Sequence, residues 1–385
     1  MMAGSLRGNC AIVGTAESDL GEVAPGMTPV DLTAQAIVRA LADCGLALAD
    51  VDGVFTATTQ TRMIAMAVSE YLGITPRYFD STQVGGSSFM AHVAHARAAI
   101  AAGRCEVAVI AYGSTQRSVS RKFASPPERN PSEDPYRPMM PPSAYALAAS
   151  RHMHQYGTTR EQLAEVAVAA RKWAQLNPKA FMREDLSVDD VLNARMVSDP
   201  FTVRDCCLVT DGGGAIVLTT PERARDLAHR PAWILGTGEH ISHNMISMMP
   251  DLTVSGAAHS GPLAFAEAGV TPADIDVLAL YDAFTYNTLV FLEDLGYCAK
   301  GEGGPFVSGG RIAPGGALAV NTSGGGLSYC HPGMYGLFLL IEAARQIHGV
   351  CGERQIAGAE LALAHGNGGV LSSQCTVIMG SDATL

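Results

Sequence analysis

The sequence has no long apolar segment. No uninterrupted apolar run in its 385 residues approaches the ~20 residues that a membrane-spanning helix needs. The N-terminal sequence MMAGSLRGNCAIVG lacks the apolar core of a signal peptide. Charged residues are also scarce, at 16% of the chain, whereas hydrophobic residues make up 48%. This composition predicts a globular, cytoplasmic protein with a large buried core and room for two or three average domains.

The sequence also lacks the cysteine spacing of a metal site or a disulfide framework. Its nine cysteines include no CxxC pair and no cysteine and histidine spacing typical of zinc. We therefore expect reduced thiols and no bound metal. The formal net charge of −11 argues against a nucleic-acid-binding surface. A polyanionic cofactor would need only a local basic patch.

A short pattern occurs twice, 224 residues apart. In each copy an alanine-rich helical stretch ends at a glycine, a short linker carries Ala-Asp-hydrophobic-Asp, and an apolar strand follows. A chance match or a common helix-to-strand connection could also produce such a pair. The pattern favours two α/β halves of similar structure. The copies are Gly45-x-x-x-Ala49-Asp50-Val51-Asp52-x-Val54 and Gly269-x-x-x-Ala273-Asp274-Ile275-Asp276-x-Leu278.

Strands and helices alternate in the first half, as in CAIVGTAES and in AHARAAIAAGRCEVAVIAYGS. This alternation is typical of parallel or mixed sheets that helices cover. Between about residues 115 and 200 the pattern changes to the proline-rich SPPERNPSEDPYRPMMPPS and the amphipathic REQLAEVAVAARKWAQLN. We predict an inserted loop domain there, and two main units at 1–220 and 221–385.

The segment NTSGGGLSYCHPGMYGLFLLIEAAR, residues 321–345, combines a glycine run, a His-Pro and a helical pattern. The glycines let backbone approach a ligand closely, and Pro332 suits the first turn of a helix. His331 would then stand at the entrance of that helix. A glycine-rich turn before a helix also occurs for structural reasons alone, so other segments must decide between the two interpretations.

Three segments together resemble the thiolase superfamily. The segment at 321–345 is similar to its C-terminal GHP motif, with Cys330 in place of the glycine. YDAFTYNTLVFLEDLGYC, residues 281–298, is similar to the HEAF/HDCF segment, and DGGGAIVLTTPERA, residues 211–224, is similar to the DGAAALVLT strand. The resemblance implies a thiolase fold, in which two duplicated βαβαβαββ halves form a layered α/β/α/β/α core with an inserted loop domain.

The same resemblance suggests where coenzyme A would bind, because thiolases bind it with the loop domain. The glycine run, Gly324, Gly325 and Gly326, is a candidate for close contact with it. Candidate cations for its phosphates are Arg171, Lys172, Lys179 and Arg183. A solvated helix face explains the same four charges.

The thiolase nucleophile is missing from this sequence. The family places a cysteine where a strand turns into the buried helix of the first half, and Gly86, within two positions, stands there in DSTQVGGSSFMAHVAHARAAI. No cysteine lies between Cys44 and Cys105. Ser87 and Ser88 are possible substitutes, but a serine needs an adjacent base.

Cys330 is the other possible nucleophile, because a thiol beside a histidine can be activated. A buried structural cysteine is the alternative interpretation. Two further positions differ from the thiolase pattern: Tyr281 replaces the HEAF-type histidine, and His365 of HGNGG replaces the second cysteine. Tyrosines at strand ends usually pack in cores, so Tyr281 draws notice only through the resemblance. His331 is retained.

With this combination of residues, the sequence resembles one branch of the superfamily, the thiolase-like lipid-transfer proteins of bacterial steroid side-chain degradation. Members of this branch cleave a β-hydroxyacyl-CoA by a retro-aldol reaction. The similarity includes VGGSSF, GGGLSxxHPGMYG and HGxGG. It implies that His331 donates to the thioester oxygen. Tyr281 and Tyr329 are candidates for the hydroxyl proton, and His365 would support them or reprotonate the enolate. A free tyrosine pKa of about 10 makes a poor base without a neighbouring group.

The resemblance therefore predicts an aldolase that cleaves a branched β-hydroxyacyl-CoA, plausibly with a steroid side chain, to a ketone and a short acyl-CoA such as propionyl-CoA. Coenzyme A enters as part of the substrate, with no covalently bound cofactor. The alternatives are a Claisen-type thiolase with a displaced nucleophile and a non-catalytic acyl-CoA or lipid-binding scaffold. Expected partners are a second copy of the chain and a small OB-fold protein with a zinc ribbon, which together would give a heterotetramer.

Overall fold

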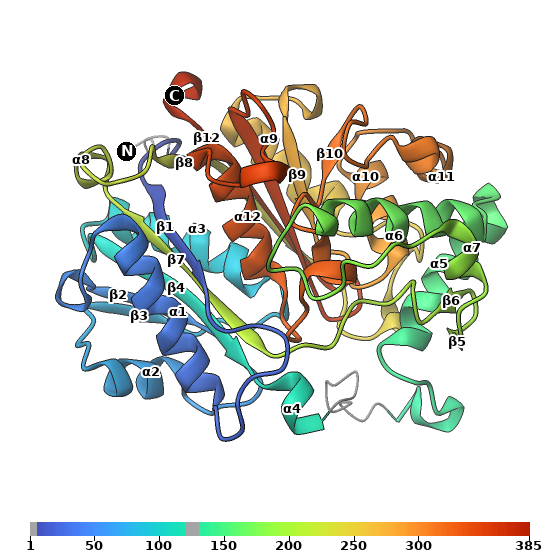
Figure 1. Cartoon of the computed structure of the whole chain (residues 1–385), viewed down its shortest axis with the longest axis horizontal. Coiled ribbons are helices and arrows are strands. Elements are labelled where there is room, and N and C mark those ends of the chain that lie inside the picture. Colours follow the sequence, from blue (N-terminus) through green and yellow to red (C-terminus); the bar gives the residue numbers. More distant parts are fainter. Residues whose placement is uncertain (1–5, 121–130) are drawn as a thin grey trace.

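The computed structural model describes residues 6–120 and 131–385 (Figure 1). Within these residues one mixed sheet of ten strands runs in the order β10-β9-β11-β12-β8-β1-β7-β4-β2-β3. Its two halves of five strands meet where β1 (Ala11–Glu17) pairs with β8 (Ala232–Ile241) over a short antiparallel contact. No helix in these two ranges is both long and apolar enough to cross a bilayer.

The two halves repeat one topology. In each, the first strand pairs antiparallel with the last, the last pairs antiparallel with a central strand, and two more strands follow in parallel. The first half runs β1, β7 (Gly212–Thr219), β4 (Val107–Ser114), β2 (Gly53–Thr56) and β3 (Tyr78–Asp80). The second runs β8, β12 (Ser373–Gly380), β11 (Leu361–Gly368), β9 (Val277–Leu280) and β10 (Ala319–Val320).

Helices occupy three layers around these strands. Two central helices, α3 (Ser88–Ala101) and α12 (Gly336–His348), pack on each other and on strands of both halves. On the outer faces, α1 (Pro29–Cys44) covers β1, β4 and β7, and α9 (Ala257–Ala268) covers β8 and β12. The predicted thiolase fold, with its α/β/α/β/α layers, is confirmed. The boundary predicted at residue 220 falls between β7 and β8 and stays a prediction.

The repeated sequence pattern corresponds to a repeated connection. Gly45 ends α1 and Gly269 ends α9, each in the left-handed conformation at φ 79° and 69°, which glycine adopts readily. A short 3₁₀ turn follows each, and then β2 or β9. The Asp52 carboxylate accepts from the backbone N–H of Val107 at the start of β4 (2.9 Å), and Asp276 accepts from Leu361 at the start of β11 (2.9 Å).

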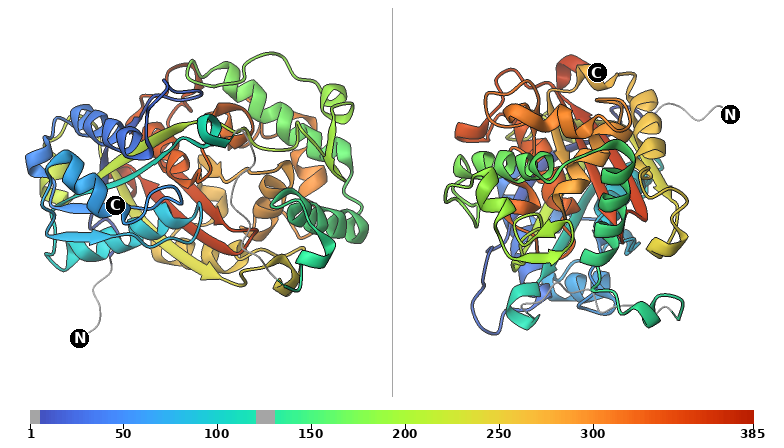
Figure 2. Two further views of the ribbon diagram at one scale, coloured as in Figure 1. Left: turned by 90° about the horizontal axis from the view of Figure 1, so that it is seen from below. Right: turned by 90° about the vertical axis from the view of Figure 1, so that its right-hand side faces the viewer.

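The predicted insertion leaves the first half between β4 and β7. Its main elements are α5 (Pro142–Tyr156), α6 (Arg160–Gln175), α7 (Val188–Leu192) and the short strands β5 (Met196–Ser198) and β6 (Phe201–Thr202), preceded by the short helix α4 (Gln116–Ser120) and a 3₁₀ turn at Asp134–Tyr136. α6 begins at a capping box between Thr159 and Gln162, and it packs on α10 (Thr285–Asp294) and α11 (Gly303–Val307). Figure 2 shows this green region beside the orange C-terminal helices. Residues 125–130 of the proline-rich stretch lie outside the described residues.

Asp52→Ala and Asp276→Ala should each lower the free energy of unfolding by about 1–2 kcal/mol, because each leaves two backbone N–H groups at a strand start without their carboxylate acceptor. Urea unfolding measures this. Asp226→Ala, at an exposed position, is the control and should change stability by at most about 0.5 kcal/mol. A large effect in only one copy would contradict the structural equivalence of the two connections.

Candidate active site

The segment with the glycine run lies buried in the centre of the molecule. Residues 325–329 form one turn of π-helix, Cys330 is extended, and α12 begins only at Gly336. Pro332 is therefore not in the first turn of the helix, contrary to the prediction. Its carbonyl oxygen instead accepts a hydrogen bond from Tyr112 of β4. Two of the four residues between His331 and α12, Gly333 and Tyr335, bond through their backbone to the hydroxyl of Tyr281, which follows β9.

The glycine run is explained by contacts within the protein. The Asp282 carboxylate accepts from the backbone N–H of Gly326 (2.7 Å) and Leu327 (3.2 Å). A side chain on Gly325 would overlap this carboxylate, and one on Gly324 would lie 2.6 Å from the Ala174 side chain in α6. Burial raises the pKa of Asp282 to about 7, although these hydrogen bonds lower it. Asp282 thus holds the turn, a role that the sequence analysis missed although it directly follows Tyr281.

His331 presents an unpaired nitrogen inside the protein. Its ring stacks on Tyr335 at a centroid distance of 5.6 Å and meets the Tyr281 ring edge-on at 5.6 Å. Its Nε2 atom is buried and has no hydrogen-bond partner among the described residues. Burial lowers the pKa of His331 to about 4, so the imidazole is neutral at physiological pH. A buried polar atom without a partner is costly, which marks this nitrogen as a group that a ligand would satisfy.

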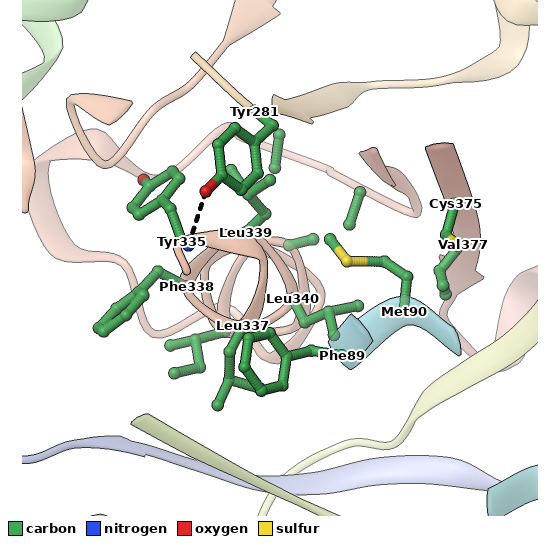
Figure 3. Packing of buried hydrophobic residues seen from close by; sticks show 14 of the residues in the cluster. Phe89, Met90, Tyr281, Tyr335, Leu337, Phe338, Leu339, Leu340, Cys375 and Val377 are labelled. Carbon is green, nitrogen blue, oxygen red and sulfur yellow. Dashed lines mark hydrogen bonds between the residues drawn. The ribbon is translucent and has the colours of Figure 1, made fainter. Parts of the chain in front are cut away.

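Tyr281 follows β9 and reaches toward α12 (Figure 3). Its hydroxyl accepts from the backbone N–H of Tyr335 (3.0 Å) and donates to the Gly333 carbonyl at the longer distance of 3.3 Å. Burial raises the pKa of Tyr281 well above its usual value of about 10. The phenol therefore stays protonated in the resting protein. The structure brings Tyr281 and His331 together, as the sequence analysis expected for neighbouring site residues.

No nucleophile stands at the entrance of α3. Gly86 lies there, and the flanking hydroxyls cap the turn: Ser87 donates to the Val84 carbonyl (3.0 Å) and Ser88 to the Gly85 carbonyl (2.6 Å). Both serines are fully buried. Cys330 is likewise fully buried, and burial raises the pKa of its thiol well above the usual value. These surroundings favour the structural interpretation of Cys330.

Tyr329 belongs to a different cluster. Its hydroxyl donates to the Glu17 carboxylate on β1 (2.7 Å), which also accepts from Lys179 (2.8 Å) and from Arg345 on α12. Burial and the Glu17 charge raise the pKa of Tyr329 well above its usual value. The hydroxyl is thus engaged in an ionic cluster, separate from the hydrogen bonds of Tyr281. Lys179, a predicted phosphate cation, is a partner of Glu17.

His365 lies in β11, and both of its ring nitrogens have partners. Gln374 donates its amide to Asn367 (2.7 Å), so its oxygen accepts from His365 Nε2 (2.8 Å). The Thr376 hydroxyl then donates to Nδ1 (2.9 Å). Burial lowers the pKa of His365 to about 4. The backbone carbonyl of His365 accepts from Tyr281 N–H (3.0 Å), so the residue supports β9 even though its ring is occupied.

The predicted cations do not share one environment. Arg171 is buried on α6 and donates to the Ser328 hydroxyl (3.0 Å) and the Glu184 carbonyl (2.8 Å), and burial lowers its pKa. Lys172 and Arg183 are exposed, and Arg183 donates to the Gln175 carbonyl (3.1 Å).

A cavity of about 240 Å³ lies between the insertion and the core. It is lined by Ala167, Arg171, Met182, Leu186, Val203, Arg204, Cys206, Cys207, Leu208, Val209, Leu327 and Ser328.

One more buried polar group lies in this region. Asn287 on α10 is fully buried, and neither amide atom finds a hydrogen-bond partner within the described ranges. It nevertheless lies close enough to Tyr145 of α5 to lower the pKa of that phenol, which burial raises to about 12. The sequence analysis did not single out Asn287; its position six residues after Tyr281 is the one signal that could have indicated it.

In the part of the chain that the structure describes, no three histidine, cysteine or acidic side chains gather as metal ligands.

Two family models match most of the chain. The one described as "Thiolase, N-terminal domain" matches residues 10–222, and the one described as "Thiolase C-terminal domain-like" matches residues 238–381. The two ranges contain nine strands of the sheet, the end of β8 and both central helices.

Individual proteins match over nearly the full length. The 17-hydroxy-3-oxo-4-pregnene-20-carboxyl-CoA lyase of Mycobacterium tuberculosis is 36% identical over 96% of this chain and 98% of its own. The steroid side-chain-cleaving aldolase of Thermomonospora curvata is 34% identical over 89% of this chain and 91% of its own. The solved Ltp2-ChsH2(DUF35) aldolase has 32% identity and a TM-score of 0.89, covering 99% of this chain and 100% of that one. The chain therefore belongs to the thiolase superfamily.

Proposed function

We propose that this protein cleaves a branched β-hydroxyacyl-CoA, with a steroid side chain as its acyl group, to a ketone and a short acyl-CoA such as propionyl-CoA. Both relatives described above carry names of steroid lyases or aldolases. The observation that carries the proposal is the contact between the Tyr281 ring and the ring of His331, whose Nε2 atom has no hydrogen-bond partner among the described residues. Tyr281 also lies against Gly86, which stands in the region where thiolases carry their nucleophilic cysteine.

The retro-aldol reaction needs no covalent step. The β-hydroxyl loses its proton, the Cα–Cβ bond breaks, and its electron pair forms the thioester enolate while the ketone carbonyl forms. The enolate then takes a proton at Cα, so that protons balance over the reaction. The protein must supply proton transfer and a donor to the enolate oxygen. A thiolase would need an accessible thiolate as well, and Cys330 offers none.

We propose that His331 donates a hydrogen bond to the enolate oxygen. With its proton on Nε2, the neutral imidazole donates one hydrogen bond in a dry environment, where such a bond stabilises developing charge strongly. We assign proton transfer to Tyr281. Because burial keeps the phenol protonated, it acts as a relay that accepts the hydroxyl proton while it releases its own toward the enolate. His365 and Tyr329 take supporting roles, through the β9–β11 pairing and the Glu17 cluster.

Coenzyme A would bind at the boundary between the insertion and the core. The cavity there joins Arg171 and Arg204 to Leu327 and Ser328 of the turn that Asp282 holds. Its lining is mainly apolar, which suits the long, narrow acyl-carrying arm of coenzyme A. The exposed Lys172 and Arg183, which are sequence neighbours of the lining residues Arg171 and Met182, would supply charge for phosphates. Gly324, Gly325 and Gly326 do not line this cavity, because they pack against Ala174 and Asp282. Leu327 and Ser328, which follow them, do line it.

His331→Ala should reduce retro-aldol turnover by about 10²–10³, or ~2.7–4 kcal/mol, because a preorganised donor to the enolate oxygen is lost. The measurement is ketone release from a β-hydroxyacyl-CoA, with thermal unfolding to confirm an intact fold. His331→Gln keeps an N–H donor and should retain more activity than the alanine variant. An unchanged kcat in His331→Ala would remove it from the oxyanion site.

Tyr281→Phe should lower kcat by about 10²–10⁴, since it deletes the relay hydroxyl and leaves the ring in place. Cys330→Ser is the matched control at a second buried position of the site. It should stay within about tenfold, or ~1.4 kcal/mol, because the mechanism has no covalent step. A severe loss in Cys330→Ser with a mild loss in Tyr281→Phe would instead identify a thiolase with a displaced nucleophile.

The protein should work as a homodimer joined through the first half. β3 is the edge strand there, and Phe79 on it is 66% exposed. Met63 and Met66, which precede this strand in the sequence, are also exposed, at 71% and 66%. An open edge with apolar side chains favours pairing with another strand.

A second protein partner is also proposed. The solved aldolase carries a second component in its name, ChsH2(DUF35), and we propose a similar small OB-fold partner with a zinc ribbon here, giving a heterotetramer.

Phe79→Asp should convert the purified chain from a dimer of about 80 kDa to its 40.2 kDa monomer at micromolar concentration, because it places charge in the paired edge. Light scattering after size exclusion measures the mass. Ile241→Asp is the control, since Ile241 is 65% exposed at the end of β8 in the other half. A monomer already in the unmodified chain would contradict the dimer.

A further inference from the structure

The entrance turn of α3 lies against backbone on several sides. A side chain on Gly336, at the start of α12, would overlap the carbonyl oxygen of Gly86. One on Gly368, at the end of β11, would overlap the Val84 carbonyl, and one on Gly85 would lie 2.6 Å from the Gly368 Cα. Carbon atoms in good contact are about 3.5–4.0 Å apart. The turn therefore has no room to move closer to α12 or to β11.

The remaining side of Gly86 is filled by Tyr281. A Cβ atom at position 86 would overlap Cε2 of the Tyr281 ring, and it would lie 2.6 Å from the phenol oxygen and 2.7 Å from the Asn367 carbonyl. The tyrosine ring thus occupies the space into which any side chain at position 86 would point.

The Tyr281 ring is itself fixed. Its hydroxyl has hydrogen bonds to the Tyr335 N–H and the Gly333 carbonyl, and the bond to Tyr335 is the dashed line of Figure 3. Edge-to-face contacts with the stacked rings of His331 and Tyr335, at centroid distances of 5.6 and 5.8 Å, also pack against it. A side chain at position 86 would have to displace this ring and break those hydrogen bonds, because the backbone around the turn cannot move.

We infer that Gly86 and Tyr281 are a sterically matched pair that determines the type of reaction: the tyrosine ring needs glycine at position 86, and so excludes a nucleophile from that position. The claim that the pair determines the reaction rests on the proposed function. The claim that the Tyr281 ring needs glycine at position 86 does not depend on any activity. The loss of a side chain at 86 and the gain of a tyrosine at 281 are then one change in the site.

The test introduces Gly86→Ala into three backgrounds: the unmodified chain, Tyr281→Phe and Tyr281→Leu. Phenylalanine keeps the Cε2 atom that the new methyl group meets, and leucine lacks both that atom and the hydroxyl. We expect Gly86→Ala to lower Tm by about 2–4 °C in the first two backgrounds, since overpacking is destabilising. In Tyr281→Leu it should lower Tm by at most half as much.

Gly336→Ala is the matched control, because its overlap with the Gly86 carbonyl does not involve Tyr281. It should lower Tm equally in the unmodified and Tyr281→Leu chains. If Gly86→Ala alone is insoluble, soluble Gly86→Ala/Tyr281→Leu supports the pair. Insolubility of both, with Tyr281→Leu itself soluble, overturns it. Equal Tm losses from Gly86→Ala in all three backgrounds also overturn it.

Tm is measured without substrate, so a chain without retro-aldol activity would refute the proposed function and leave the steric result standing. In an active chain, Gly86→Ala should lower turnover at least about 10²-fold, because it displaces the group assigned to proton transfer. Unchanged turnover in a folded Gly86→Ala protein would overturn the claim that this pair determines the reaction.

Discussion

The site depends on backbone lying directly against backbone where the two halves meet. The turn at Gly85 and Gly86 contacts Gly336 of α12 and Gly368 of β11 at distances that leave no room for a Cβ atom. Main chain deforms far less easily than side chains, so these contacts fix α3, α12 and the β11–β12 hairpin as one unit. Buried residues such as Phe89 and Met90 on α3 pack on α12 around this contact (Figure 3).

Buried charge holds the remaining parts to that unit. The Glu17 carboxylate at the end of β1 binds Lys179 of the insertion, Arg345 of α12 and the hydroxyl of Tyr329. Although burial raises it, Arg345 and Lys179 hold the pKa of Glu17 well below its usual range. Three parts of the chain that are distant in sequence, β1, the insertion and the segment 321–345, therefore share one ionised group. Asp282 holds the turn before His331 in a similar way, through backbone donors. Asp282 and Glu17 thus fix the stretch 326–329 that leads to His331.

The motifs and the repeated connection predicted the fold, because their order along the chain reflects the topology. They also named Tyr281 and His331 as candidates for one site, where the structure brings the two rings into contact. They did not predict side-chain directions. Tyr329 lies two residues from His331, yet the π-helical turn directs its hydroxyl to Glu17. His365 is engaged by Gln374 and Thr376, which only the β11–β12 pairing brings beside it. The burial of Arg171 and the role of Asp282 likewise follow from packing between segments far apart in the sequence.

The insertion leaves and rejoins the sheet between two adjacent strands. β4 ends at Ser114 opposite Gly212, where β7 begins, so the sheet already holds together the two points from which the insertion emerges. Closing a longer or shorter excursion at such a point costs little chain entropy. The region that faces the ligand cavity can therefore change length and sequence in evolution without disturbing the strands that carry the chemistry. The part of the chain to which we assign coenzyme A binding and the part to which we assign the reaction can thus vary independently.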